Sequence, residues 1–321
     1  MGSPWMQVDD AGTTVVAAFD IPLRLRFRGV TSRTGVLVRG AAGWGEWSPF
    51  ADHRPHLAAR WWRAAHEAAT RAWPRARRDT VPVNAIVPVV DPQRAHDLTR
   101  ASGCTTAKVK VGDAGDVARV EAVRDALGPD GRLRLDVNAA WDLETAVEKL
   151  RALARFDLEY VEQPVADLAD FARLRTRVDV PLAADESVRL APDPLHIRGI
   201  DATDVVILKV QPLGGVWRCL EVAEACGRPA VVSSAVETSV GLAAGVALAA
   251  ALPDLPHACG LGTATLLAGD VVEDPLVPVD GQLAVRRPVP SVPLIDRWSA
   301  GDDVVAAWGR RLDTVREVVG A

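Results

Sequence analysis

The sequence contains very little lysine. Only four of its 321 residues are lysine, so 33 of the 37 basic residues are arginine. Three of the lysines, Lys108, Lys110 and Lys209, nevertheless lie inside short apolar runs that are typical of buried strands. A buried lysine can release its proton, whereas arginine stays charged in proteins. The pattern favours proton-transfer chemistry, and the alternative is a set of strand-end lysines whose amines simply reach solvent.

Other absences exclude several classes of protein. The four cysteines form no CxxC pair, which argues against a zinc knuckle or a disulfide framework. The net charge of −5 gives no basic surface for nucleic acid and no polybasic membrane signal. The chain begins with no basic-then-apolar leader, and the apolar run at 240–252 falls short of the ~20 residues that span a bilayer. We therefore expect a cytoplasmic protein without nucleic-acid or membrane partners.

Residues 1–82 predict a small α+β domain. Short β-rich stretches are separated by glycines and charged turns, and a helical pattern follows in which Trp61 and Trp62 stand among arginines. Pro74 and Pro82 mark the exit from this unit. The strands are expected at 13–20, 34–40 and 43–47, and the helix at 56–72.

Residues 83–268 repeat an apolar run followed by a helical pattern, which predicts βα units and a parallel sheet. Eight such runs favour a modified (β/α)8 barrel over an open doubly wound sheet, because no glycine-rich phosphate fingerprint follows the first strand. The short segment after residue 195 leaves room for only a rudimentary helix. Strands are expected at 84–90, 107–112, 132–138, 158–164, 181–187, 204–210, 229–236 and 258–263, and helices at 116–127, 143–155, 216–226 and 239–251.

Ionisable residues occupy the same place in five consecutive units, near the end of each predicted strand. Barrel enzymes carry their catalytic groups at the carboxyl ends of the strands, so we expect these side chains to meet in one site. Strand side chains alternate between two faces, so Lys108 and Lys110 share the inner face. The five positions, with spacings of 26, 26, 23 and 24 residues, are Lys110, Asp136, Glu162, Asp185 and Lys209.

Three carboxylates from adjacent strands would repel one another in a site of low dielectric unless a cation held them. Ligands that are all oxygen, without His or Cys, suit a hard ion, so Mg²⁺ is the natural choice and Mn²⁺ is possible. Lysines on both flanks of the metal fit abstraction of a proton α to a carboxylate. The alternative is a structural network of ion pairs, which rarely compensates for its own desolvation.

Five short motifs, in this order and spacing, resemble the enolase superfamily, and most closely its o-succinylbenzoate synthases of menaquinone biosynthesis. The similarity extends over most of residues 20–270, and the segment 43–50 resembles the capping domain of that family. The resemblance implies a (β/α)7β barrel whose mouth is closed by an N-terminal α+β cap. The motifs are Lys108-Val109-Lys110, Leu135-Asp136-Val137-Asn138, Val161-Glu162-Gln163-Pro164, Ala184-Asp185-Glu186-Ser187 and Leu208-Lys209-Val210-Gln211-Pro212.

The resemblance also implies a role for each matching residue. Asp136, Glu162 and Asp185 become Mg²⁺ ligands. Lys110 becomes the general base with Lys108 beside it, and Lys209 stabilises the enediolate intermediate from the opposite side. The reaction implied is syn dehydration of 2-succinyl-6-hydroxy-2,4-cyclohexadiene-1-carboxylate to 2-succinylbenzoate, in which Lys110 removes the proton α to the ring carboxylate.

The substrate class depends on the remaining polar groups. The eighth strand region, 259–263, has no carboxylate that would hold the ammonium group of a dipeptide-epimerase substrate. Serine hydroxyls and the predicted helix start at 238–241 instead offer neutral donors to an anionic tail, although ordinary capping explains them equally well. A substrate with a second carboxylate is therefore favoured. The expected substrate-binding residues are Asn138, Ser233, Ser234, Gly262 and Thr263.

Several alternatives stay open. N-succinylamino acid racemisation needs the same tail and the same two lysines, and dipeptide epimerisation belongs to the same superfamily. Lys209 could also form a Schiff base in an aldolase-like barrel, or the polar ring could be purely structural in a barrel that only binds. Many relatives have glycine where this chain has Ala139, so we expect the turn there to avoid a positive φ and to differ slightly.

Residues 269–321 are expected to return to the N-terminal domain. They contain a proline-rich linker, a short strand at 282–285 and a helix from about 303 to 319. The acidic run 270–274 is expected to face solvent. The loop at 26–29 is the expected specificity loop of the cap.

Overall fold

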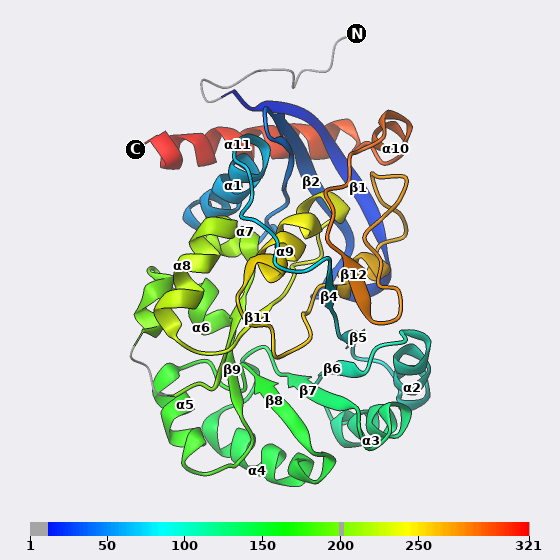
Figure 1. Ribbon diagram of the computed structural model, residues 1–321, viewed down its shortest axis with the longest axis vertical. Helices are drawn as coiled ribbons and strands as arrows, with labels where there is room; N and C mark the ends of the chain where they lie inside the picture. The colour runs from blue at the N-terminus through cyan, green and yellow to red at the C-terminus, as the bar shows by residue number, and fades with distance from the viewer. Residues whose placement is uncertain (1–11, 199–201, 321) are drawn as a thin grey trace.

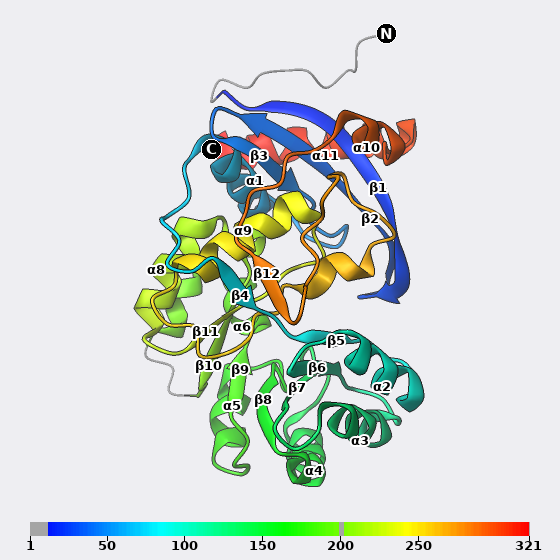
Figure 2. The same ribbon diagram turned by 45° about the vertical axis from the view of Figure 1, so that its right-hand side comes forward.

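A computed structural model describes residues 12–198 and 202–320. At one end of the molecule lies an antiparallel sheet in the order β1 (Thr14–Phe27), β2 (Val30–Gly40) and β3 (Gly43–Trp47). The helices α1 (Pro55–Thr70) and α11 (Asp302–Gly320) lie beside it, and the barrel occupies the other end (Figures 1 and 2). The C-terminal helix therefore packs on the N-terminal domain, as expected.

The strands of the first hairpin are longer than the predicted strands at 13–20 and 34–40. β1 continues to Phe27 and β2 already begins at Val30, so the first half of the segment 26–29 is strand and the second half is the turn. Arg28 and Gly29 both have positive φ angles, which is the geometry of a tight two-residue hairpin turn. A rigid hairpin thus carries Phe27 and Arg28 toward the barrel.

The barrel is built from seven parallel strands in the order β11-β10-β9-β8-β7-β6-β5. It closes through bridges of Gly260 to Ser233 and of Cys259 to Val83, so the predicted eighth strand shrinks to two residues. The strands are β5 (Ala85–Val87), β6 (Thr106–Lys110), β7 (Arg132–Asp136), β8 (Leu158–Glu162), β9 (Leu182–Ala184), β10 (Val205–Leu208) and β11 (Ala230–Val232).

Helices follow most of these strands, as the alternation predicts. The segment between β9 and β10 has only the short α6 (Glu186–Arg189) and the 3-10 turn η2 (Pro194–Ile197) in its described part, which agrees with the expected rudimentary helix. None of the described helices is long and apolar enough to cross a membrane. The others are α2 (Pro92–Ala101), α3 (Asp116–Leu127), α4 (Leu143–Leu153) with η1 (Ala154–Phe156), α5 (Leu168–Arg175), α7 (Val210–Leu213), α8 (Val216–Cys226) and α9 (Ser239–Ala251).

Helix α9 lies between the barrel and the N-terminal sheet (Figures 1 and 2). All of its residues are buried, and most are alanine, glycine or valine. A helix that is apolar all round belongs in an interior, and small side chains let neighbouring backbones approach. This helix contributes to two cores, because Val240 packs with residues of the N-terminal sheet and residues 242–250 pack with the barrel strands.

The chain after the barrel contacts earlier parts of the protein at two places, β4 (Thr80–Pro82) and the start of α9. Beyond η3 (Gly262–Leu266), β12 (Gln282–Ala284) pairs with β4, and α10 (Val292–Arg297) precedes α11. The expectation that the 270–274 run faces solvent is wrong for Asp270. That side chain is buried, and the backbone N–H and hydroxyl of Ser239 donate to it at 3.0 and 2.7 Å. The boundaries at 82 and 268 stay predictions.

The turn after β7 keeps left-handed geometry without glycine. Asn138 and Ala139 have φ angles of 48° and 61°. The expectation that alanine would avoid a positive φ is therefore wrong at this position. Asn tolerates this region, but alanine is strained there by about 1 kcal/mol.

Ala139→Gly is expected to stabilise the protein by about 1 kcal/mol, because glycine adopts this backbone without strain. Urea denaturation measures the change. Ala140→Gly, at the next position without a positive φ, is the matched control and should be neutral or destabilising. Equal effects of the two substitutions would contradict the strain at Ala139.

Candidate active site

A cavity of about 310 Å³ opens where the carboxyl ends of the barrel strands meet the N-terminal sheet. Phe27, Arg28 and Phe50 line it from the N-terminal domain, and polar side chains of the strand ends line it from the barrel. The N-terminal domain therefore caps the barrel mouth, and both parts of the chain contribute to one site.

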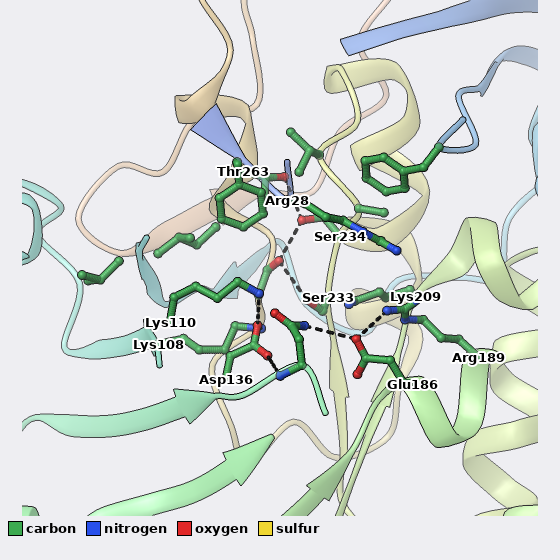
Figure 3. Close-up of a pocket in the computed structure, with 18 residues that line it drawn as sticks. Arg28, Lys108, Lys110, Asp136, Glu186, Arg189, Lys209, Ser233, Ser234 and Thr263 are labelled. Carbon is green, nitrogen blue, oxygen red and sulfur yellow. Dashed lines mark hydrogen bonds and ion pairs between the residues drawn. The ribbon is translucent and has the colours of Figure 1, made fainter. Parts of the chain in front are cut away.

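One side of the cavity carries the lysines of β6 (Figure 3). Lys108 donates to Glu162 Oε2 at 2.9 Å and its ammonium lies 3.6 Å from Asp136 Oδ2. Lys110 donates to the same Asp136 oxygen at 3.3 Å. The parallel register pairs Lys110 with Asp136 and Asp136 with Glu162, so these contacts follow directly from the strand alignment.

The other side carries Lys209, which donates to Asp185 Oδ2 at 2.6 Å. Arg189 Nε donates to the second oxygen of Asp185 at 3.0 Å. Asp185 and Lys209 stand just beyond β9 and β10, at the starts of α6 and α7. The side-chain oxygen of Gln163 accepts from the backbone N–H of Asp185 at 3.0 Å, which fixes the turn that presents this carboxylate.

These groups differ in how the surroundings shift their pKa. Burial, Asp136 and Asp185 raise the pKa of Glu162 to about 7, against the opposing effect of Lys108. Burial also disfavours ionised Asp136, but Lys110 and Lys108 outweigh it and hold the pKa below the usual range. For Lys108, burial lowers the pKa, yet Glu162 and Asp136 outweigh it and raise the value above normal. The two carboxylates thus favour the charged form of Lys108.

The three carboxylates fit a hard cation by their chemistry. They come from adjacent strands and offer only oxygen, and Glu162 Oε1 is buried without a hydrogen-bond partner. Across residues 12–198 and 202–320, however, no three acidic, His or Cys groups already lie close enough together to share a metal ion. Each carboxylate instead forms an ion pair with a basic side chain: Glu162 with Lys108, Asp136 with Lys110 and Asp185 with Arg189.

Four of the five predicted substrate-binding residues line the cavity, and the fifth does not. Ser233, Ser234, Thr263 and Asn138 line the cavity, and Ser234 Oγ lies 2.7 Å from Thr263 Oγ1. Gly262 instead lines a neighbouring cavity behind η3, and Gly260 takes its place here. Glu162 and Asp185 lie beneath the lining residues and are almost fully buried.

The start of α9 offers little to a substrate. Glu46 accepts from the backbone N–H groups of Thr238 at 3.0 Å and Gly241 at 3.2 Å, and Asp270 accepts from that of Ser239. The protein's own carboxylates therefore already occupy the donors that sequence reasoning offered to an anionic tail.

Sequence reasoning placed Arg28 in the expected specificity loop without a role of its own, and it gave Arg189 and Glu186 no role. Arg189 Nη2 donates to Glu186 Oε1 at 2.7 Å, and its Nη1 is buried without a partner. The three-residue spacing of Glu186 and Arg189 on one helical turn was the available signal. Arg28 stacks on Phe50, with its guanidinium carbon 4.2 Å from the ring centroid, and makes no hydrogen bond or ion pair with described residues. Only the hairpin geometry brings it to the cavity.

Residues 18–69 match the model of the enolase N-terminal domain-like family, and residues 92–290 match that of the enolase C-terminal domain-like family. A cap of this kind on a barrel with lysines and carboxylates at its strand ends is the architecture of that class. The chain is 62% identical over 305 residues to the o-succinylbenzoate synthase of Thermobifida fusca, covering 93% of this chain and 95% of the relative. It belongs to the enolase superfamily and, within it, to the family of the o-succinylbenzoate synthases.

Other relatives agree with this placement. The o-succinylbenzoate synthase of Mycolicibacterium smegmatis is 51% identical over 277 residues, with 84% of this chain and 85% of the relative covered. Among solved structures, the N-succinyl Arg/Lys racemase from Bacillus cereus has a TM-score of 0.76 at 21% identity, covering 90% of this chain and 98% of that one. At that identity the second likeness concerns the fold alone. Proteins of the superfamily are metal-dependent, typically with Mg²⁺.

Lys108→Met is expected to destabilise the protein by about 3 kcal/mol in the presence of a chelator, because it leaves Glu162 buried without its ionic partner. Urea denaturation measures the loss. Lys149→Met is the matched control, because Lys149 lies on α4 with a third of its side chain exposed, and it should lose less than about 1 kcal/mol. A loss for Lys108→Met no larger than the control's would show that the carboxylates do not depend on this lysine.

Proposed function

We propose that this protein is an o-succinylbenzoate synthase, a hydro-lyase that dehydrates 2-succinyl-6-hydroxy-2,4-cyclohexadiene-1-carboxylate to 2-succinylbenzoate. The observation that carries the proposal is one cavity with Lys110 on one side and Lys209 on the other, above buried carboxylates. The close identity to relatives of that activity supports the choice of substrate.

The proposed cofactor is Mg²⁺, with Mn²⁺ as the possible substitute, and Asp136, Glu162 and Asp185 are the residues that would hold it. Bound there, the metal supplies positive charge next to the substrate carboxylate, where negative charge grows as the α-proton leaves. Burial of the three carboxylates and the unpartnered oxygen of Glu162 support this assignment.

In the proposed mechanism, Lys110 in its neutral form removes the proton α to the ring carboxylate. The C–O bond of the neighbouring hydroxyl then breaks on the same face, and the proton on Lys110 leaves with it as water. Lys209 stays an ammonium beside Asp185 and stabilises the developing negative charge from the opposite side. Lys108 keeps Glu162 and Asp136 in place. Formation of the aromatic ring supplies the driving force.

The succinyl carboxylate needs its own partner. Arg28 lines the cavity and forms no ion pair with a described carboxylate, and the hydroxyls of Ser234 and Thr263 line the same space. We assign the tail to this end of the cavity.

The test is turnover of the cyclohexadiene substrate, followed by absorbance of the aromatic product with Mg²⁺ and with a chelator. Wild type should turn over only with Mg²⁺. Lys110→Ala should lower kcat by about a thousandfold, the usual loss for a general base, whereas Lys149→Ala should not. Absence of turnover by wild type with Mg²⁺ would falsify the proposed reaction while leaving the family membership intact.

Arg28→Met is expected to raise KM about tenfold and to change kcat by less than about threefold, because the tail contact is the same in the ground and transition states. Arg26→Met, at the end of β1 in the same hairpin but outside the cavity lining, is the control and should leave both constants unchanged. An unchanged KM for Arg28→Met argues that the tail binds elsewhere.

N-succinylamino acid racemisation is the second candidate, because two lysines on opposite sides of one cavity also suit a two-base reaction. There Lys209 would move a proton, and α-deuterium exchange would survive the loss of either lysine alone. For the synthase, exchange should disappear in Lys110→Ala and persist in Lys209→Ala. Dipeptide epimerisation, a Schiff-base aldolase and a non-catalytic barrel are weaker candidates. A cytoplasmic location and the absence of nucleic-acid and membrane partners stay predictions.

A further inference from the structure

Val236 has a backbone conformation that its side chain disfavours. Its φ is 64°, in the left-handed region where a β-branched residue is a genuine outlier. The residue belongs to the turn between β11 and α9, and it lines the cavity together with Ala235, Ser234 and Ser233. A strained backbone at a site wall persists only where the surrounding contacts enforce it.

Two residues of the cap supply those contacts. Arg33 of β2 donates from Nε to the carbonyl oxygen of Val236 at 2.9 Å. Glu46 of β3 accepts from the backbone N–H of Thr238 at 3.0 Å and also from its hydroxyl. Within the turn itself, Glu237 accepts from the N–H of Ala235 at 2.8 Å. The carbonyl group of the strained Val236 thus accepts its hydrogen bond from a cap residue, although the turn itself belongs to the barrel.

The same cluster also contacts Phe50, a cap residue that lines the cavity. Ser48 joins the two cap residues, because its hydroxyl donates to Glu46 at 2.7 Å and its carbonyl accepts from Arg33 at 2.6 Å. The Phe50 ring lies between two guanidinium groups, with Arg33 at 4.3 Å and Arg28 at 4.2 Å from its centroid. Arg33, Glu46 and Ser48 are all almost fully buried, so this cluster is a fixed part of the interior.

We propose that Arg33 and Glu46 are positioning residues that couple the seating of the cap to the shape of the substrate cavity. With the cap seated, they hold the 234–238 turn in its strained form, so that Ser234 and Ala235 face the substrate tail. Without these contacts the turn relaxes to an unstrained conformation and the cavity wall moves. Neither residue touches substrate. The kinetic part of the test rests on the proposed function, whereas the exchange part does not.

The exchange experiment measures amide hydrogen exchange in peptides covering residues 233–241. Arg33→Met should speed exchange there about tenfold, because the turn opens more readily without its donor. Peptides from the cap helices α1 and α11 should keep their protection. Arg39→Met is the matched control, because Arg39 lies on the same strand and stacks on Trp44 away from the turn. Unchanged exchange at 233–241 in Arg33→Met overturns the proposal whatever the substrate is.

The kinetic experiment asks whether the strain itself matters. Arg33→Met should raise KM about tenfold with kcat changed by less than about threefold, since only the wall geometry is lost. In the Val236→Gly background the same substitution should raise KM by less than about threefold, because glycine adopts a positive φ without the clamp. A tenfold rise in both backgrounds means that Arg33 acts through something other than the turn, and overturns the proposal.

Arg33→Lys covers the case in which Arg33→Met fails to fold. Lysine keeps the charge and one donor but loses the second donor to Ser48, so an intermediate KM and intermediate exchange at 233–241 are expected. Wild-type values for both measurements in Arg33→Lys, together with an unfolded Arg33→Met, would assign Arg33 to stability alone.

Discussion

The pairing of buried carboxylates with lysines at the ends of adjacent parallel strands constrains the rest of the structure. Glu162 is almost fully buried, and among the described residues Lys108 is the only cation that binds it directly. An unpaired charge in that place would cost several kcal/mol, so the strand register has to be held accurately. The apolar neighbours Val109, Leu135 and Val161 provide this, because they alternate with the charged residues and pack outward against the helices. The barrel core and the polar site are thus two faces of the same strands.

The cap completes what the barrel cannot supply. The strand ends offer charge and hydroxyl groups, but the aromatic wall and the free guanidinium come from Phe27, Phe50 and Arg28 of the cap. Carboxylates of the cap and of the returning chain also occupy the start of α9. The polar groups at this domain boundary are therefore satisfied within the protein, and the site faces a space bounded by both domains.

Much of this arrangement could be predicted from the sequence, because side chains alternate along a strand and the ionisable residues recur once in each βα unit. The spacing of Lys110, Asp136, Glu162, Asp185 and Lys209 follows the βα repeat, so the inner face of each strand could be inferred without coordinates. Arg28 was placed only in a general specificity loop and Arg189 was missed, because their positions depend on a hairpin and on a single helical turn. The burial of Asp270 and the positive φ of Ala139 depend on contacts between distant segments and on local strain, and neither leaves a periodic pattern.

Tryptophan packing in the cap has a consequence for the order in which the protein forms. The ring of Trp47, near the N-terminus, meets Trp62 and the Trp308 ring of α11 edge-on, at centroid distances of 5.6 and 5.0 Å. Translation separates Trp47 from Trp308 by on the order of tens of seconds at ordinary elongation rates. The barrel strands are translated in between, so the first elements of the cap are made before the barrel and its last helix, α11, is made after it. The cap can therefore take its final form only after α11 has been made, when the barrel strands and their polar ends have already been translated.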